Sequence, residues 1–189
     1  MRLTDKNDIR QRLLSDPRWC VYALGDLTDR MFVKCQWFTS ASATAADATS
    51  PDLTLVLHDY GTNILFAVGT ASIREALDHV SWPVHLQVRP EGLEEVANFA
   101  RITDVKRMLR MGFEGSATLE ATEDTPSTDI RPLGLGRAVT AAVLHRLRHL
   151  PTVGLNVRED NVPAIRVYES LGFVRHCEFC EAIAHPRAR

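Results

Sequence analysis

The sequence contains no apolar stretch long enough to cross a membrane and no surplus of positive charge. Its longest apolar runs, such as "ILFAV" at 64–68, fall far short of the roughly 20 residues that a membrane-spanning helix needs. Lys and Arg total 22 and Asp and Glu total 24, so no global basic field is available to hold nucleic acid. The N-terminus "MRLTDKNDIRQRL" has no apolar core, so we expect no secretory signal. These features favour a globular, cytoplasmic protein without a membrane or nucleic-acid partner.

Cysteine is also scarce, with four residues in a chain of 189. Cys177 and Cys180 form a C-x-x-C, but a structural zinc site needs two further ligands at matching spacing, and there is no second C-x-x-C. The pair also lies in a stretch with a strand pattern, where positions three apart face opposite sides. His145 and His149 have helical spacing without the Glu of an H-E-x-x-H motif. We therefore expect no metal site and reduced cysteines.

Alternating and helical hydrophobic patterns predict an α/β fold of short elements. "YGT" at 60–62 is typical of a hairpin turn, and the Thr-rich, acidic segment 114–130 is the best candidate for a linker. The patterns predict helices at 4–14, 16–27, 71–80, 91–100, 137–149 and 161–171, and strands at 31–38, 52–59, 63–69, 84–89, 104–113, 152–158 and 173–184.

The order strand, helix, strand, helix, strand occurs twice, and a shift of 69 residues aligns the two occurrences without a gap. "LQVR" at 86–89 then falls on "LNVR" at 155–158, and the predicted helix at 71–80 falls on 140–149. We interpret this register as a duplicated unit. The second copy has glycine or polar residues where the first differs: Gly134 falls on Leu65, Gly136 on Ala67, Asn161 on Gly92 and Tyr168 on Phe99.

The stretch "RPLGLGRAV" at 131–139 places two glycines at the start of a helix in this second copy. A P-loop would need a lysine after its last glycine, and a Rossmann turn would need a third glycine where Val139 stands. The remaining phosphate-binding interpretation is R-x-x-G-x-G, formed by Arg131, Gly134 and Gly136. Its bare backbone and unbonded helix N–H groups would face a pyrophosphate. A plain glycine turn that only begins the helix stays open as an alternative.

A second motif, N-x-x-A-x-x-x-Y-x-x-x-G-F, follows the predicted strand at 152–158. Asn161 can cap the helix, and Gly172 can end it in the left-handed conformation. Tyr168 lies seven residues after Asn161, nearly two turns along and on the same face. A half-buried core tyrosine is the structural alternative to a functional one.

Taken together, the two motifs resemble those of the GNAT superfamily of N-acetyltransferases. The resemblance is specific over 131–184, and 16–113 is similar to a degenerate GNAT-like lobe, as in family members with tandem lobes. It implies a mixed, mostly antiparallel sheet flanked by helices and organised as two related lobes. The lobes would be 1–113 and 131–189, joined by the linker 114–130.

The resemblance also implies a chemistry and a set of site residues. Acetyl-CoA would be the co-substrate, a small-molecule or peptide amine the acceptor, and a second copy of the chain a partner in a homodimer. Tyr168 would protonate the departing thiolate, and Asn161 would contact the cofactor arm. The residues implied to hold the pyrophosphate are Arg131, Leu133, Gly134, Leu135, Gly136, Arg137 and Ala138.

The family's strand before the glycine turn, which supplies an N–H donor for the oxyanion, has no counterpart here. Only "EDTPSTDIRPL" at 123–133 immediately precedes the turn. The nearby carboxylates that could serve as the general base are Glu120, Glu123 and Asp124, and we interpret them as solvated linker charges. Three arrangements follow. We favour tandem lobes with a shortened second lobe, or a C-terminal unit that borrows "SATLEAT" or "STDIRPL" as a strand, over a single composite sheet.

Two function classes remain open from the sequence. One is an acetyl-CoA-dependent N-acetyltransferase, on the evidence of the two motifs. The other is a non-catalytic CoA-binding or interaction protein, because the half of the site that would bind the acceptor has no counterpart in the sequence.

Overall fold

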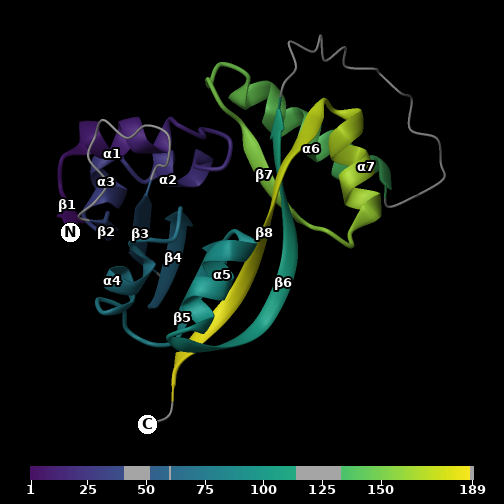
Figure 1. The fold of residues 1–189 in the computed structure, drawn as a ribbon. Coiled ribbons are helices and arrows are strands. Elements are labelled where there is room, and N and C mark those ends of the chain that lie inside the picture. Colours follow the sequence, from purple (N-terminus) through teal and green to yellow (C-terminus); the bar gives the residue numbers. More distant parts are fainter. Residues whose placement is uncertain (41–51, 60, 114–132, 188–189) are drawn as a thin grey trace.

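The strands pair into one eight-stranded sheet with helices against it, in a computed structural model that describes residues 1–40, 52–59, 61–113 and 133–187 (Figure 1). The strands are β1 (Arg2–Leu3), β2 (Cys35–Phe38), β3 (Leu53–Asp59), β4 (Thr62–Val68), β5 (Val84–Val88), β6 (Ala100–Phe113), β7 (Gly154–Arg158) and β8 (Phe173–Pro186). The helices are α1 (Lys6–Leu13), α2 (Val21–Gly25), α3 (Asp29–Phe32), α4 (Ile73–Leu77), α5 (Pro90–Ala97), α6 (Leu133–Leu147) and α7 (Val162–Ser170).

The predicted fold class is confirmed: a mixed, mostly antiparallel sheet flanked by helices. The hairpin is confirmed too, since Asp59 pairs with Thr62 and Gly61 has a φ of 72°. Several boundaries were wrong. The predicted strand at 31–38 begins with the short helix α3, and the predicted helix at 137–149 begins four residues earlier, at Leu133. The two glycines therefore lie in the first turn of α6. No helix among the described residues is both long enough and apolar enough to span a membrane.

The strand order is β1-β2-β3-β4-β5-β8-β6-β7, and every neighbouring pair is antiparallel except β4 and β5. β8, from the C-terminal part of the chain, lies between β5 and β6, which both precede residue 114. β7 then pairs with β6 and forms one edge of the described sheet. The topology therefore corresponds to the single composite sheet, the arrangement that the sequence favours least. The division into an N-terminal lobe and a C-terminal portion stays a prediction, and both contribute strands to the same sheet.

Three hydrophobic clusters hold the helices against the sheet. The first lies between α1, α2 and the sheet, and its largest side chains are Trp19, Trp37, Phe66 and Phe179. The other two lie under the opposite face, because strand residues alternate between faces. One packs beneath α4 and α5 and includes Leu65, Leu86 and Val96. The other packs beneath α6 and α7 and includes Leu109, Met111, Leu144 and Ile165.

A β-bulge in the β6–β8 pair directs the side chains of His176 and Cys177 to the same face of the sheet, the face covered by α1 and α2. Arg110 pairs with Cys177 and Met111 pairs with Arg175, so His176 is an extra residue in β8. His176 hydrogen-bonds Asp16 ahead of α2, and Cys177 packs against the first cluster on that side of the sheet. The bulge therefore brings polar groups into contact with the segment that leads into α2.

Gly172 should be one of the most sensitive glycines in the chain. Its φ is 92°, and an added Cβ would lie 3.1 Å from the ring of Phe113. We expect Gly172→Ala to lower the free energy of unfolding by about 1–3 kcal/mol, because both the backbone conformation and the packing oppose a side chain. Urea denaturation measures the loss.

The matched control is Gly25→Ala in α2, where an added Cβ meets nothing within 4 Å and φ is not left-handed. The control should be neutral or slightly stabilising, because alanine favours a helix over glycine. Equal losses in the two variants would contradict this account of Gly172.

Candidate functional site

The start of α6 exposes its backbone. An added Cβ at Gly136 would meet nothing within 4 Å, and Gly136 has no left-handed φ, so neither packing against described residues nor backbone strain requires glycine there. Leu135, Arg137 and Ala138 are also exposed. The first N–H groups of a helix have no partner within the helix. The arrangement leaves room for a ligand to approach the backbone. Arg131 lies outside the described residues.

The second motif forms the predicted capped helix, α7. The Asn161 side-chain oxygen accepts a hydrogen bond from the Ala164 N–H at 3.3 Å, so Asn161 is the N-cap. Pro163 is tolerated in the first turn, where its missing N–H would have no partner within the helix. Gly172 takes the left-handed conformation after the helix, and Phe173 packs back into the core with 4 % of its surface exposed. The predicted capping roles are therefore all present.

Tyr168 lies at the edge of the cluster beneath α6 and α7. Its ring meets the Phe173 ring edge-on, with 6.0 Å between centroids. Its hydroxyl has no hydrogen-bond partner among the described residues. α6 reaches the same cluster through Leu144, which is 1 % exposed. The structure thus places the two motifs on neighbouring helices over one face of the sheet (Figure 1).

The outer surface of α6 is apolar and uncovered in the part of the chain that the structure describes. Leu135, Val139 and Val143 are spaced by four residues and are 71 %, 62 % and 50 % exposed. Side chains at this spacing form one line along a helix. β7 beside this region also has no described strand on its outer edge. The carboxylates considered as bases, Glu120, Glu123 and Asp124, lie outside the described residues.

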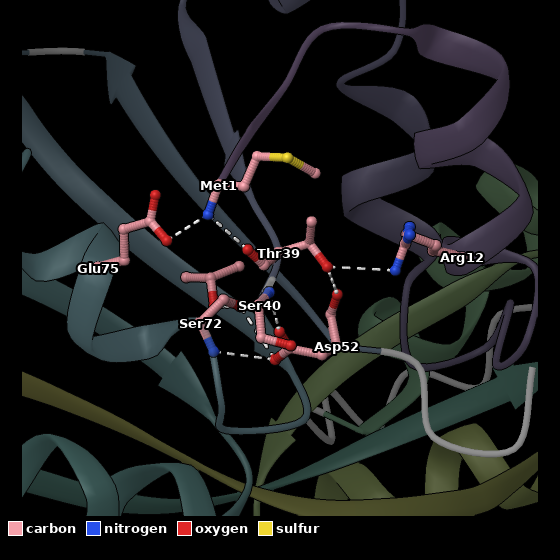
Figure 2. A network of polar contacts seen from close by, with 8 residues as sticks. Met1, Arg12, Thr39, Ser40, Asp52, Ser72 and Glu75 are labelled. Carbon is pink, nitrogen blue, oxygen red and sulfur yellow. Dashed lines mark hydrogen bonds and ion pairs between the residues drawn. The ribbon is translucent and has the colours of Figure 1, made fainter. Parts of the chain in front are cut away.

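The first copy of the repeat has different structure at the corresponding position. β5 and β6 correspond to β7 and β8, but Leu65 and Ala67, which align with the two glycines, are buried inside β4. The helix that follows, α4, has a carboxylate of its own chain at its start. Asp52 Oδ1 accepts hydrogen bonds from the Ser72 N–H and hydroxyl, both at 3.0 Å, and its Oδ2 accepts from the Ser40 N–H (Figure 2). An anionic ligand would meet a buried negative charge there.

The opposite face of the sheet carries a polar cluster that the sequence motifs did not reveal. Asp16 accepts a hydrogen bond from the Trp19 N–H at 3.1 Å, Arg89 Nη2 lies 2.6 Å from its Oδ2, and His176 Nε2 lies 2.7 Å from its Oδ1. Burial alone would raise the pKa of Asp16, but these partners outweigh it and lower the pKa from 3.8. Burial beside this cluster raises the pKa of the Cys20 thiol to about 12. Cys20 is therefore a protonated core residue.

The two cysteines of the C-x-x-C are partly or fully buried as well. Cys177 and Cys180 lie three apart on β8 and so on opposite faces, and burial raises the pKa of both thiols. No group of three or more His, Cys, Asp or Glu side chains is placed to hold a metal ion within the described ranges.

Arg110 is the most unusual side chain on this face. It is 0 % exposed, and its Nε, Nη1 and Nη2 have no hydrogen-bond partner in the part of the chain that the structure describes. Burial lowers its pKa from the ordinary value. Its guanidinium lies among three aromatic rings, with 4.5 Å to the Tyr22 centroid, 5.2 Å to Trp19 and 5.5 Å to Phe179. The only signal in the sequence is an arginine at a position that alternates with Leu109 and Met111 inside an apolar strand.

Comparison with known proteins confirms the resemblance for the C-terminal part of the chain. Residues 125–181 match the family model described as FR47-like protein. A mycothiol acetyltransferase of Thermomonospora curvata is 59 % identical over 46 residues, which are 23 % of this chain and 16 % of the relative. One of Acidothermus cellulolyticus is 61 % identical over 46 residues, 23 % of this chain and 14 % of the relative. The C-terminal segment of the chain is therefore similar to FR47-like proteins and to part of the mycothiol acetyltransferases. It spans less than a fifth of the length of these curated relatives.

A solved structure has the same fold along the whole chain. A Drosophila protein determined by X-ray crystallography aligns with a TM-score of 0.62 and 10 % sequence identity, covering 100 % of this chain and 99 % of its own. At this identity the likeness concerns the fold alone.

Asp16→Asn should destabilise the protein in a pH-dependent way. Because the folded pKa of Asp16 is lowered, its contribution to stability is present above the unfolded pKa of about 3.9 and is lost as pH falls through the folded pKa. We expect a loss of about 1–3 kcal/mol at pH 7, since removing the charge weakens its hydrogen bonds to Arg89 and His176. Urea denaturation at pH 7 and pH 3 should show the difference from the parent shrinking at the lower pH.

Asp160→Asn is the matched control, because Asp160 forms an ion pair with Arg158 at 2.5 Å but is fully exposed. It should leave stability nearly unchanged at both pH values. A pH-independent loss in Asp16→Asn would contradict the role assigned to its charge.

Proposed function

We propose that this protein is an acetyl-CoA-dependent N-acetyltransferase that binds the cofactor's pyrophosphate at the start of α6. The observation that carries the proposal is the bare backbone at Gly136, in a segment that matches a GNAT-related family model. The relatives that match over short segments are named mycothiol acetyltransferases, which supports acetyl transfer as the reaction class. The acceptor is a small-molecule or peptide amine, and the compartment is the cytoplasm.

The cofactor's phosphates would be held by backbone as well as by charge. The N–H groups of residues 133–136 begin a 15-residue helix, whose dipole favours an anion at that end. Arg137, exposed in the same turn, adds positive charge, and Arg131, two residues ahead of Leu133 in the sequence, would add more. A side chain at 136 would occupy the space through which the phosphates approach.

Two residues of the second motif would act further along the cofactor. The Asn161 oxygen already caps α7, so its amide N–H₂ group is the part that would donate to the pantetheine arm. Tyr168 would act at the thioester. The amine nitrogen attacks the carbonyl carbon, the carbon–sulfur bond breaks, and the thiolate takes the phenolic proton. The nitrogen loses a proton to water as it becomes an amide, and the phenolate takes a proton back from water. A thiol pKa near 8.5 and a phenol pKa near 10 make this proton transfer nearly balanced.

A second candidate is a protein that binds CoA without transferring the acyl group. Two features of the described residues favour it: the exposed line of Leu135, Val139 and Val143, and the edge of β7, which pairs with no described strand on its outer side. The two candidates differ only in chemistry, so binding and turnover must be measured separately.

Acetyl-CoA should raise the melting temperature of the protein, and Gly136→Leu should abolish the rise. Ligand at 100 times its Kd stabilises a protein by about 2.7 kcal/mol. A Cβ added at 136 meets no atom of the described residues within 4 Å, and leucine favours a helix over glycine. The unliganded variant should therefore be at least as stable as the parent. Differential scanning fluorimetry measures both temperatures.

Gly25→Ala is the control and should keep the full rise. Calorimetry should find at most one acetyl-CoA per chain. In the first copy the positions aligned with the two glycines are buried in β4, and the Asp52 carboxylate lies at the start of the helix that follows. No rise in the parent at millimolar acetyl-CoA would exclude both candidate functions.

Tyr168→Phe should separate the two candidates. In an acetyltransferase the hydroxyl acts only on the leaving thiolate, so its loss should lower kcat by about 10²–10⁴-fold and leave acetyl-CoA binding unchanged. Thiol release with a panel of amines measures turnover. Background release from both parent and variant, with acetyl-CoA still bound, would identify the non-catalytic protein.

A further inference from the structure

We propose that a cavity between β4, β5, β6 and β8 binds a small aliphatic amine as its cation, and that the Glu181 carboxylate accepts hydrogen bonds from the ammonium group. The cavity has a volume of about 260 Å³. Pockets for drug-sized molecules measure roughly 300–1,000 Å³, so this cavity suits a smaller ligand. The proposal does not rest on the proposed function, because no described residue of α6 or α7 lines the cavity.

The cavity lies on the face of the sheet that α1 and α2 cover only in part. Ala182 and Ala184 of β8 pack into the cluster beneath α4 and α5. Glu181 and Ile183 alternate with them and therefore face the other side. On that side, the cluster beneath α1 and α2 includes no residue of β8 beyond Phe179. The cavity opens where this cluster ends.

The floor of the cavity carries a carboxylate without a counter-charge. Glu181 lies between Gln87 of β5 and Lys106 of β6, its direct cross-strand neighbours. Glu181 and Gln87 are half-buried, whereas Lys106 is exposed. Within the described ranges, no hydrogen bond or ion pair engages the Glu181 carboxylate or the Gln87 amide. A partly buried carboxylate is stabilised by a cation that donates hydrogen bonds to it.

The charges around the cavity favour a cation. Glu181 and Asp104 carry two negative charges against the one positive charge of Lys106, so the lining is negative overall with His85 counted as neutral. Lys106 is exposed, and its flexible stem lets its ammonium group move into solvent when another cation enters. An anionic ligand would meet the two carboxylates.

A β-bulge forms one wall of the cavity. The pairing of β6 with β8 shifts between Thr103, opposite Ile183, and Lys106, opposite Glu181. Asp104 lies within the shift and has a φ of 53°. A bulge bends its strand and redirects the side chains beside it. Asp104 therefore lines the cavity as its second carboxylate, at the exposed rim.

Apolar surface beside the carboxylates defines the rest of the ligand. Ile64 and Ile183 are half-buried and pair on either side of His85 in the sheet. A short carbon chain can pack on them, whereas a metal ion would gain nothing from this surface. No group of three or more His, Cys, Asp or Glu side chains in the described part of the chain is placed to hold a metal ion. An aliphatic ammonium ion uses both the charge and the apolar surface.

The test uses calorimetry at pH 7 with butylamine and two matched probes, butanol and butyrate. We expect butylamine to bind, butanol to bind about tenfold more weakly or worse, and butyrate not to bind, because only the ammonium group makes a charge-assisted hydrogen bond. Glu181→Gln should reduce the affinity for butylamine to that for butanol. Lys106→Met should lower the Kd for butylamine by about two- to fivefold, because it removes an exposed like charge.

Glu178→Gln is the matched control, because Glu178 lies on the same strand but is exposed, paired with Arg107 and absent from the cavity lining. It should bind butylamine as the parent does. Thermal melting without ligand checks that each variant is folded. Glu181→Gln should melt near the parent's temperature, since the Glu181 side chain has no partner to lose among the described residues.

Three outcomes would overturn the proposal. The first is no binding of butylamine to the parent, and the second is binding that Glu181→Gln leaves unchanged. The third concerns γ-aminobutyrate, which adds a carboxylate to the same chain and should bind more weakly than butylamine. If it binds more tightly, and if Lys106→Met removes the gain, the site is one for zwitterions rather than for amines.

Discussion

The pairing of β8 with β6 is the interaction on which the rest of the structure depends. The ladder runs from Ala100 opposite Pro186 to Phe113 opposite Phe173, and the other edge of β8 pairs with β5. Neither half of the chain has a complete sheet without this strand, because it fills the position between two strands of the first half. The bulge within the same ladder also directs His176 towards Asp16. β8 therefore contributes to the cluster beneath α4 and α5 and to the cluster beneath α6 and α7. Through His176 it also holds the segment that leads into α2.

Most of the elements could be predicted from the sequence, but their spatial order could not. Alternation and capping residues identify strands such as 84–89 and the helix that begins after Asn161, because these are local properties. The insertion of 173–186 between two distant strands depends on which edges remain unpaired in three dimensions. A repeat in sequence suggested two sheets, whereas pairing between the repeats gave one. The start of α6 at Leu133 was also missed, since glycines disfavour a helix interior.

The candidate functional residues likewise fall into two groups: those that the sequence motifs predict, and one that only the structure reveals. Gly136, Asn161 and Tyr168 were found from motif spacing, and the structure adds that the first has open space around it and the second is a helix cap. Arg110 was not found, because an arginine in an apolar strand has no motif. It stands out by its surroundings, because three aromatic rings lie around it and none of the described residues accepts a hydrogen bond from it. Such a feature can only be recognised when the partners of a buried group are counted.

The position of β8 has a consequence for synthesis of the protein on the ribosome. Until residues 173–186 have emerged, β5 and β6 each present an open edge, with the apolar faces of both partly assembled cores beside them. Unpaired edges and exposed apolar surface are the features that drive nascent chains to associate with one another. A ribosome that stalls before this strand would therefore release an intermediate prone to aggregation, and a nascent chain at this stage is the form most dependent on chaperones.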